Sequence, residues 1–183
     1  MYLAVTIARA ARRIRLPRRH AELRFIVSRK QRISEYTVER LLAATRDTQP
    51  APGAGSAGAV ALALAASCAG KAANITLKHH PEDESVRAAA QRFEQLSQEA
   101  LSAGEEDAEA FEQYITEGHE AGRAPLVRAS SHVESLIERL EQTIRAIESR
   151  IDPVMAGDFI AARALAQAAR LIQIRNRSEI DAA

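Results

Sequence analysis

The feature that most constrains the fold is a run of small apolar residues from Ser56 to Leu77. Alanine, glycine, leucine and valine occupy all sides of the helix that this run would form, as is typical of a helix surrounded by other helices. Small side chains let backbones approach closely, so the run predicts the centre of a tight bundle or a subunit interface. About 20 apolar residues would also suffice to cross a membrane. Lys71 and the weak hydrophobicity of alanine and glycine argue against that alternative, and we expect no membrane span.

The composition favours helices and a single domain. Aromatic residues make up 4% of the 183 residues, tryptophan is absent, and there are only 8 glycines and 6 prolines. Sheets favour β-branched and aromatic residues, whereas alanine favours helices, and a chain of this length is typical of one domain. The single cysteine, Cys68, cannot form an internal disulfide. We expect it to be a small buried thiol, in a reducing, cytoplasmic setting.

Charge divides the chain into a basic start and an acidic remainder. Residues 1–32 carry ten of the 25 lysines and arginines and one of the 24 acidic residues, which leaves 15 basic and 23 acidic side chains, a net charge of −8, on residues 33–183. We therefore expect no nucleic-acid-binding surface on the main domain. The extension has three interpretations: an arm for nucleic acid or an anionic membrane surface, an arginine-rich organelle-targeting leader, or a weakly ordered appendage, which we favour.

Start and stop signals predict five helices in residues 33–183. Ser34 is the predicted N-cap of a short first helix, which ends before the turn-rich residues 49–53. The small-residue helix follows, and Pro81 is expected at the first position of a long third helix. The prediction is an all-α, compact five-helix bundle of the up-and-down type, with a central Ala/Gly-rich helix and the basic extension attached.

The fourth helix is expected after a connection over residues 118–125. Its apolar residues follow a four-three-four-three-four spacing, which is typical of a bundle or coiled-coil seam: Val133, Ile137, Leu140, Ile144, Ile147 and Ile151. The helix breaks at Asp152-Pro153. Asp158 then is the predicted N-cap of the last helix, whose apolar residues are Phe159, Ile160, Leu165, Ala169 and Ile172.

A carboxylate interrupts the apolar stripe of the long third helix. The stripe advances in steps of three and four with one gap: Val86, Ala90, Phe93, Leu96, Ala100, Gly104, Phe111 and Tyr114 or Ile115. Asp107 fills the gap. A carboxylate facing a core must be hydrogen-bonded, paired or protonated, because unpaired burial is costly. Asp107 is therefore either an acid-base group with a raised pKa or a structural partner of Lys71 or Lys78.

Four blocks of sequence resemble the cyclodeaminase/cyclohydrolase family of folate one-carbon enzymes. Residues 50–56, Pro-Ala-Pro-Gly-Ala-Gly-Ser, lead through the small-residue helix to Asn-Ile-Thr at 74–76, and are similar to the family's Pro-Gly-Gly-Gly-Ser turn and its Asn-Leu-Thr. Asp-Ala-Glu-Ala-Phe at 107–111 resembles the family's Asp-Ala-x-Ala-Phe. Asp158, with apolar residues after it and Asn176, resembles the closing Ser-Asp and Asn-Val segment. The blocks occur in family order and cover about residues 33–178.

The resemblance implies a helical bundle that dimerises and acts on tetrahydrofolate carrying a one-carbon unit. Cyclodeaminases convert 5-formiminotetrahydrofolate to 5,10-methenyltetrahydrofolate and ammonia, and cyclohydrolases interconvert the methenyl and 10-formyl forms. It implies Asp107 as the catalytic acid-base group. The sequence has no phosphate-binding glycine loop and no Cys-x-x-Cys, so we expect no metal and no cofactor besides the folate substrate. The implied substrate-binding residues are Gly53, Gly55, Ser56, Asn74, Lys78, Asp158 and Asn176.

Structural interpretations remain open for most of these residues. Residues 53–56 are either an anion-binding helix start, suited to the carboxylates of folate, or a plain turn with Ser56 as N-cap. For Asp158 and Asn176, a helix cap is the interpretation that the sequence alone favours. His79-His80 lacks a further ligand at a spacing diagnostic of metal. Ala54 replaces the middle glycine of the family turn, and would be strained at positive φ.

A non-catalytic interaction module is the alternative function. Residues 117–125 replace a longer family segment that contains a Leu-Pro-Lys turn. A shortened relative could use the seam of Val133 to Ile151 to bind a partner helix, with the basic extension as a tether.

Overall fold

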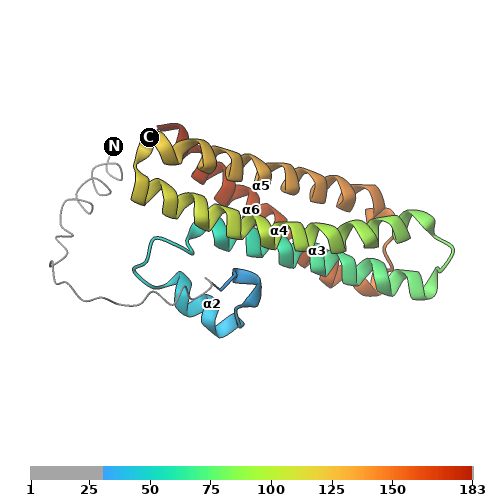
Figure 1. Cartoon of the computed structure of the whole chain (residues 1–183). Coiled ribbons are helices and arrows are strands. Elements are labelled where there is room, and N and C mark those ends of the chain that lie inside the picture. The colour runs from blue at the N-terminus through green and yellow to red at the C-terminus, as the bar shows by residue number, and fades with distance from the viewer. Residues whose placement is uncertain (1–30, 183) are drawn as a thin grey trace.

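The computed structural model describes residues 31–182, apart from the side chains of residues 119 and 121. The predicted basic extension lies outside these residues except for its last two. Successive long helices run antiparallel and form an up-and-down bundle (Figure 1): α3 (Ala54–His79), α4 (Glu84–Glu117), α5 (His119–Ile147) and α6 (Ala156–Ala182). The shorter elements are η1 (Ile33–Glu35), α2 (Val38–Thr45), η2 (Glu148–Arg150) and η3 (Pro153–Met155). The all-α prediction with five α-helices is confirmed.

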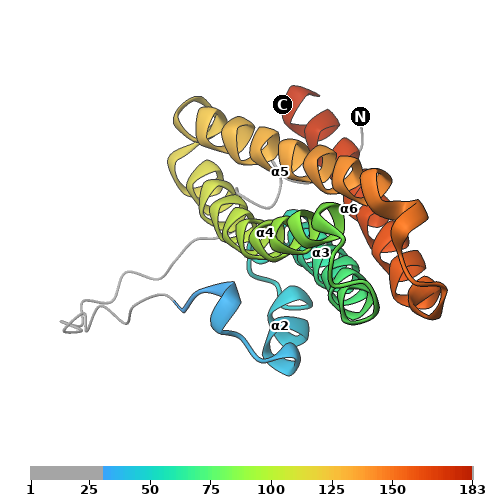
Figure 2. The same ribbon diagram turned by 90° about the vertical axis from the view of Figure 1, so that its right-hand side faces the viewer.

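The short helix α2 lies outside the four-helix bundle, below α3 and α4 in the turned view (Figure 2). None of its residues is buried. The chain before it is held by Ser34, whose backbone N–H and hydroxyl both donate to Glu105 Oε1 of α4, at 3.2 and 2.7 Å. The prediction of Ser34 as an N-cap is therefore wrong. Thr37 caps α2 instead, and its hydroxyl accepts a hydrogen bond from Arg40 N at 3.1 Å.

Small residues bring α3 and α4 into close contact near the start of α3. A Cβ atom built on Gly104 would lie 3.0 Å from the Cβ of Ala59, so a larger side chain at residue 104 would separate the helices. Ser56, fully buried, donates from its hydroxyl to the carbonyl of Gly104 at 3.3 Å. The prediction that small side chains permit close helix packing holds at this contact.

One side of α3 is open to solvent. The helix packs against α4 and α6, and Leu64 on its outer side is 52% exposed. Cys68 is only partly buried. The predictions of a helix surrounded on all sides and of a buried thiol are therefore wrong. Of the described helices, α3 alone is long and apolar enough to cross a membrane by length and composition.

The seam of α5 faces the interior of its own bundle. Val133, Ile137, Leu140, Ile144 and Ile147 are all buried and belong to one core with residues of α3, α4 and α6. This packing confirms that the regularly spaced apolar residues of α5 form a bundle seam. It leaves the seam no surface for a partner helix, so the predicted partner-binding use of these residues is wrong.

Three predicted helix boundaries differ from the structure. α4 begins after Asp83, whose carboxylate accepts hydrogen bonds from Ser85 N and Val86 N at 3.0 and 3.1 Å, so Pro81 is not at its first position. Gly118 alone separates α4 from α5, and the expected connection up to Pro125 is helical instead. Asp158 lies in the first turn of α6 but does not precede it, and so is not its N-cap.

Candidate functional site

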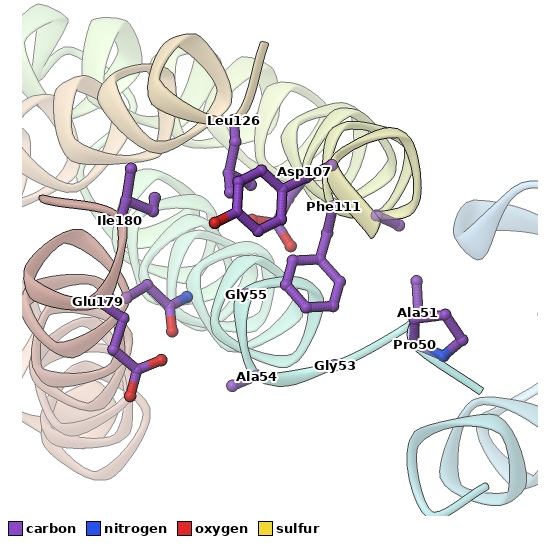
Figure 3. Close-up of a pocket in the computed structure, with 13 residues that line it drawn as sticks. Pro50, Ala51, Gly53, Ala54, Gly55, Asp107, Phe111, Leu126, Glu179 and Ile180 are labelled. Atoms are coloured by element: carbon purple, nitrogen blue, oxygen red, sulfur yellow. The ribbon is translucent and has the colours of Figure 1, made fainter. Parts of the chain in front are cut away.

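A pocket of about 300 Å³ lies at the end of the bundle where α3 begins and α6 ends. Small-molecule sites commonly start at about this size. Helices α3, α4, α5 and α6 and the turn before α3 contribute to it (Figure 3). Its lining residues are Pro50, Ala51, Gly53, Ala54, Gly55, Asp107, Ala108, Phe111, Tyr114, Leu126, Asn176, Glu179 and Ile180.

Asp107 lies directly against the first turn of α3. The close contact at Gly104 sets α4 near α3, and Asp107 follows one turn later on the same side of α4. A Cβ atom built on Gly55 would collide with both carboxyl oxygens of Asp107. Glycine at residue 55 is therefore what lets the carboxyl group reach this position.

Burial raises the pKa of the Asp107 carboxyl from 3.8 to about 6. Loss of hydration disfavours the charged form of the carboxyl group. Lys71, one of the two proposed structural partners, pairs with Asp158 instead, at 2.9 Å. Lys78, the other, lines a different groove. The half-buried acid thus stands in the pocket with a pKa near neutrality, as the acid-base interpretation requires.

The first turn of α3 presents free backbone donors beside this carboxyl. Gly53 is the N-cap, without a side-chain cap, and the first helical hydrogen bond runs from Ala57 N to Gly53 O at 3.0 Å. The N–H groups of the first three residues of an α-helix have no helical acceptor. Ala54 is not strained, because no non-glycine residue among 31–182 has a positive φ. Ser56 points away, toward Gly104, and does not cap the helix.

Two aromatic rings form the α4 wall of the pocket. Phe111 and Tyr114 lie with ring centroids 6.4 Å apart and ring planes 23° from parallel. Burial raises the pKa of the Tyr114 phenol. A Cβ atom built on Gly122 of α5 would collide with the backbone of Tyr114, so this glycine lets α5 start close to the end of α4. The sequence placed Phe111, and Tyr114 or Ile115, on the core stripe and indicated no role for them in a site.

The pocket contains two carboxyl groups and no lysine or arginine among its lining residues. Asp107 is on α4, and Glu179 is on the α6 side (Figure 3). Glu179 Oε1 also lies 2.9 Å from Arg175 Nε, one turn earlier on the outside of α6. Glu179 and Ile180 were not among the predicted site residues. Their spacing of three and four residues from Asn176 on one helix is the signal that could have found them.

Four of the eight predicted site residues meet at this pocket: Gly53, Gly55, Asp107 and Asn176. The other four do not line it. Asn74 and Lys78 line a separate groove between α3 and α4, Asp158 pairs with Lys71, and Ser56 is buried beneath the turn. One site thus unites the Asp107 block, the glycine turn and Asn176, but not the Asn-Ile-Thr block.

Residues 31–182 contain no group of three or more His, Cys, Asp or Glu side chains that could hold a metal ion. His79 at the opposite end of α3 makes a close contact with Asp152 instead, Nδ1 to Oδ2 at 2.6 Å. His132 pairs with Glu106 at 2.9 Å.

Comparison with known proteins identifies the family. The formiminotransferase-cyclodeaminase family matches residues 37–176, which include α2 to α5, most of α6 and the four residues that meet at the pocket. No curated protein matches the chain. With most of its length matched, the chain belongs to the folate-related formiminotransferase-cyclodeaminase family.

Proposed function

We propose that the protein is a folate one-carbon enzyme that converts 5-formiminotetrahydrofolate to 5,10-methenyltetrahydrofolate and ammonia, or hydrolyses the methenyl compound to 10-formyltetrahydrofolate. The observation that carries this proposal is the Asp107 carboxyl, half-buried in a pocket with a pKa of about 6. General acid-base catalysis is most effective when the pKa of the group lies near the working pH. Asp107 meets that condition close to neutrality.

In the cyclodeamination, N10 of the folate attacks the formimino carbon, and the bond from that carbon to the nitrogen that leaves as ammonia then breaks. The ionised Asp107 accepts the proton from N10, and the same carboxyl returns a proton to the departing nitrogen. A pKa of about 6 keeps both forms accessible near neutral pH. In the hydrolysis, a water molecule attacks the methenyl carbon and Asp107 accepts one of its protons. The bond from that carbon to N5 then breaks and N5 takes the remaining hydroxyl proton, which leaves a formyl group on N10.

The pocket is suited to the one-carbon end of the substrate. Its aromatic wall of Phe111 and Tyr114 provides a flat apolar surface for a fused ring, and Asn176 supplies an amide that can both donate and accept hydrogen bonds. The backbone of Gly53 and Gly55 borders the same space. A volume of about 300 Å³ leaves the glutamate part of a folate outside.

A spectrophotometric assay tests the proposal. Purified protein receives 5-formiminotetrahydrofolate, and the near-ultraviolet absorbance of methenyltetrahydrofolate is followed. Loss of that absorbance from added methenyl compound reports the hydrolysis. We expect turnover in at least one direction, and a fall of roughly 10²- to 10⁴-fold for Asp107→Asn. Glu109→Gln, on the exposed side of α4, is the matched control and should retain activity.

No turnover in either direction by the wild-type protein would remove the enzymatic proposal. Equal turnover by Asp107→Asn would remove only the role of Asp107. The second candidate, a non-catalytic interaction module, draws support from the single-residue junction at Gly118, since α5 follows α4 without the longer segment typical of the family. In that case the protein would bind partners through a surface other than the buried α5 seam.

A homodimer formed through the small-residue helix and a cytoplasmic location belong to the same proposal. The support for the dimer is the open side of α3, where Leu64 is exposed among small residues. No membrane span, metal or further cofactor is part of the proposed function.

A further inference from the structure

A buried hydrogen-bonded pair joins α5 and α6 outside the pocket. Gln173 of α6 is 5% exposed and Ser130 of α5 is 3% exposed. The side-chain Nε2 of Gln173 donates to the carbonyl oxygen of Ser130 at 2.8 Å and to its hydroxyl oxygen at 2.6 Å. Among residues 31–182, four polar side chains are buried, and Gln173 is the largest of them. A buried amide without partners is costly, so this contact helps to decide where α6 lies against α5.

The pair lies between two apolar clusters of the bundle. The main core includes Val133 of α5 and Ala169 of α6, each within about one turn of the pair. The smaller cluster includes Ala129 of α5 and Ile180 of α6. Beyond Gln173, Ile180 is the only further buried residue in the described part of α6. Gln173 is therefore the last residue that fixes α6 at the main core before the helix reaches the pocket.

The other core-facing residues of α6 do little to fix its position along the bundle. After Phe159 they are Ala162, Ala166 and Ala169. Methyl groups of equal size interlock weakly, so a row of them specifies a register poorly. A polar group buried at one position does specify a register, because it loses its partner in any other. Gln173 is the residue of α6 that meets this condition.

The ion pairs between α5 and α6 repeat along both helices and so do not specify one register. Arg163 pairs with Glu148, and Arg170 Nε lies 2.7 Å from Glu141 Oε1. The two arginines and the two glutamates are each seven residues apart. A shift of α6 by this interval would bring Arg163 opposite Glu141 and preserve an ion pair. The bond from Gln173 has no such repeat.

Pocket residues follow the pair closely on both helices. Asn176 and Ile180 come three and seven residues after Gln173, and Leu126 comes four residues before Ser130. Residues at these intervals lie on the same face of a helix. Leu126 and Ile180 border the same pocket (Figure 3). A single buried contact therefore connects the α5 wall of the pocket to its α6 wall.

We propose that Gln173 is a positioning residue, which through Ser130 sets where Asn176 and Ile180 stand relative to Asp107. Gln173 does not line the pocket, so it acts through the residues that do. The inference deepens the proposed function and rests on it, since positioning affects turnover only if this pocket binds the folate. Asn176 contributes to binding, whereas Asp107 on α4 contributes to the chemical step. Loss of the contact therefore weakens binding more than chemistry.

A kinetic split tests this role. Gln173→Met keeps the length of the side chain and removes the donor. We expect the KM of the folate that is turned over to rise about tenfold, and kcat to fall less than about threefold. Ser130→Ala keeps the carbonyl acceptor and should raise KM by a smaller factor. Adding Ser130→Ala to Gln173→Met should change KM no further, because the two residues act as one unit.

A matched control separates positioning from stability. Ala162→Gly weakens α6 earlier in the same core row and does not touch the pair. It should leave KM unchanged. An equal rise of KM in Ala162→Gly and Gln173→Met would show that general weakening of α6 is the cause, and would overturn the positioning role.

Spin-label distances test the same role without any turnover. In the full chain with Cys68→Ala, labels are attached to Ser178→Cys of α6 and Glu109→Cys of α4, both exposed positions. Pulsed electron paramagnetic resonance then measures the distance between them. We expect Gln173→Met to shift or broaden this distance distribution. A second pair, Ala164→Cys with Glu109→Cys, reports on α6 before Gln173 and should not change.

The outcomes separate this inference from the proposed function. If the wild-type protein turns over neither folate, the enzymatic proposal fails, and a changed distance in Gln173→Met but not in Ala162→Gly still supports the positioning of α6. Unchanged distances in Gln173→Met, or equal changes in both variants, would overturn it whatever the turnover. A changed distance with an unchanged KM would also overturn it, because the displaced residues would not serve the site. If Gln173→Met does not fold, Ser130→Ala replaces it in both measurements.

Discussion

At the scale of single residues, Asp107 links the pocket to the stability of the fold. Its pKa is about 6 in the folded protein, against 3.8 for an unperturbed aspartate. The folded state therefore holds this proton more tightly than the unfolded chain does. Well below pH 3.8 the carboxyl is protonated in both states, so its burial does not affect stability. Between about pH 4 and pH 6 the unfolded chain loses the proton while the folded state keeps it, so the folded state loses stability; above about pH 6 the carboxyl is ionised in both states and the cost stays constant.

We therefore expect Asp107→Asn to gain stability relative to the wild type as the pH rises. The free energy of unfolding of the variant, minus that of the wild type, should increase by about 1–3 kcal/mol between pH 4 and pH 7.5. Urea unfolding of both proteins at the two pH values measures this change. Glu109→Gln should show no comparable trend, and a difference for Asp107→Asn that is independent of pH would contradict burial as the cause.

Gly55 is the second residue on which the site depends. In Gly55→Ala, the new methyl group would collide with the Asp107 carboxyl, the movable end of a side chain, so that carboxyl must shift. We expect turnover to fall about 10- to 100-fold, because a small displacement of an acid-base group is costly, while the melting temperature changes little. Gly53→Ala, whose Cβ would lie 3.6 Å from the carbonyl of Pro50, should be tolerated much better. Equal activity of both variants would show that the contact with Gly55 does not position Asp107.

At the scale of helices, periodic patterns predicted which faces are buried but not where the helices begin. The inward residues of α4 and α5 follow from local spacing, and most are buried. The first residues depend on contacts with other helices. Ser34 bonds to Glu105, 71 positions away, and so cannot cap α2. Arg150 Nη1 donates to Asp83 Oδ2 at 2.9 Å. Asp83 is the N-cap of α4, so the helix begins after Asp83 and not at Pro81.

The one-residue junction between α4 and α5 requires glycine. Gly118 has φ 93° and ψ 170°, a region that is open almost only to glycine. Gly118→Ala should lower the free energy of unfolding by about 1–3 kcal/mol, measured by urea denaturation. Gly157→Ala is the control, since it lies in the first turn of α6 with no atom within 4 Å of an added Cβ. It should be neutral or slightly stabilising. A loss as large as that of Gly118→Ala would mean that the backbone angle is not the cause.

At the scale of the whole molecule, the open side of α3 is where we expect two copies to meet. Leu64→Lys should convert the proposed dimer to a monomer, as judged by light scattering after size exclusion, because a lysine there would place a charge in an apolar contact. Ile160→Lys introduces the same charge at an exposed apolar position of α6, where Ile160 is 67% exposed. If Ile160→Lys breaks the dimer and Leu64→Lys does not, the interface lies on α6. A wild-type monomer would remove the dimer altogether.

The sequence by itself determined the helical class, the buried stripes of α4 and α5, and the inward position of Asp107, because each of these depends on residue spacing within a single helix. Only the tertiary structure decided which residues share a pocket. Close packing of Gly104 on Ala59 places Asp107 beside Gly55. Helix α6 ends at the end of the bundle where α3 begins, and this brings Asn176 and Glu179 to the same pocket. Lys78, near the far end of α3, lines a different groove. The offset between neighbouring helices along the bundle axis decides which residues lie at the same end. That offset depends on contacts between segments far apart in the chain.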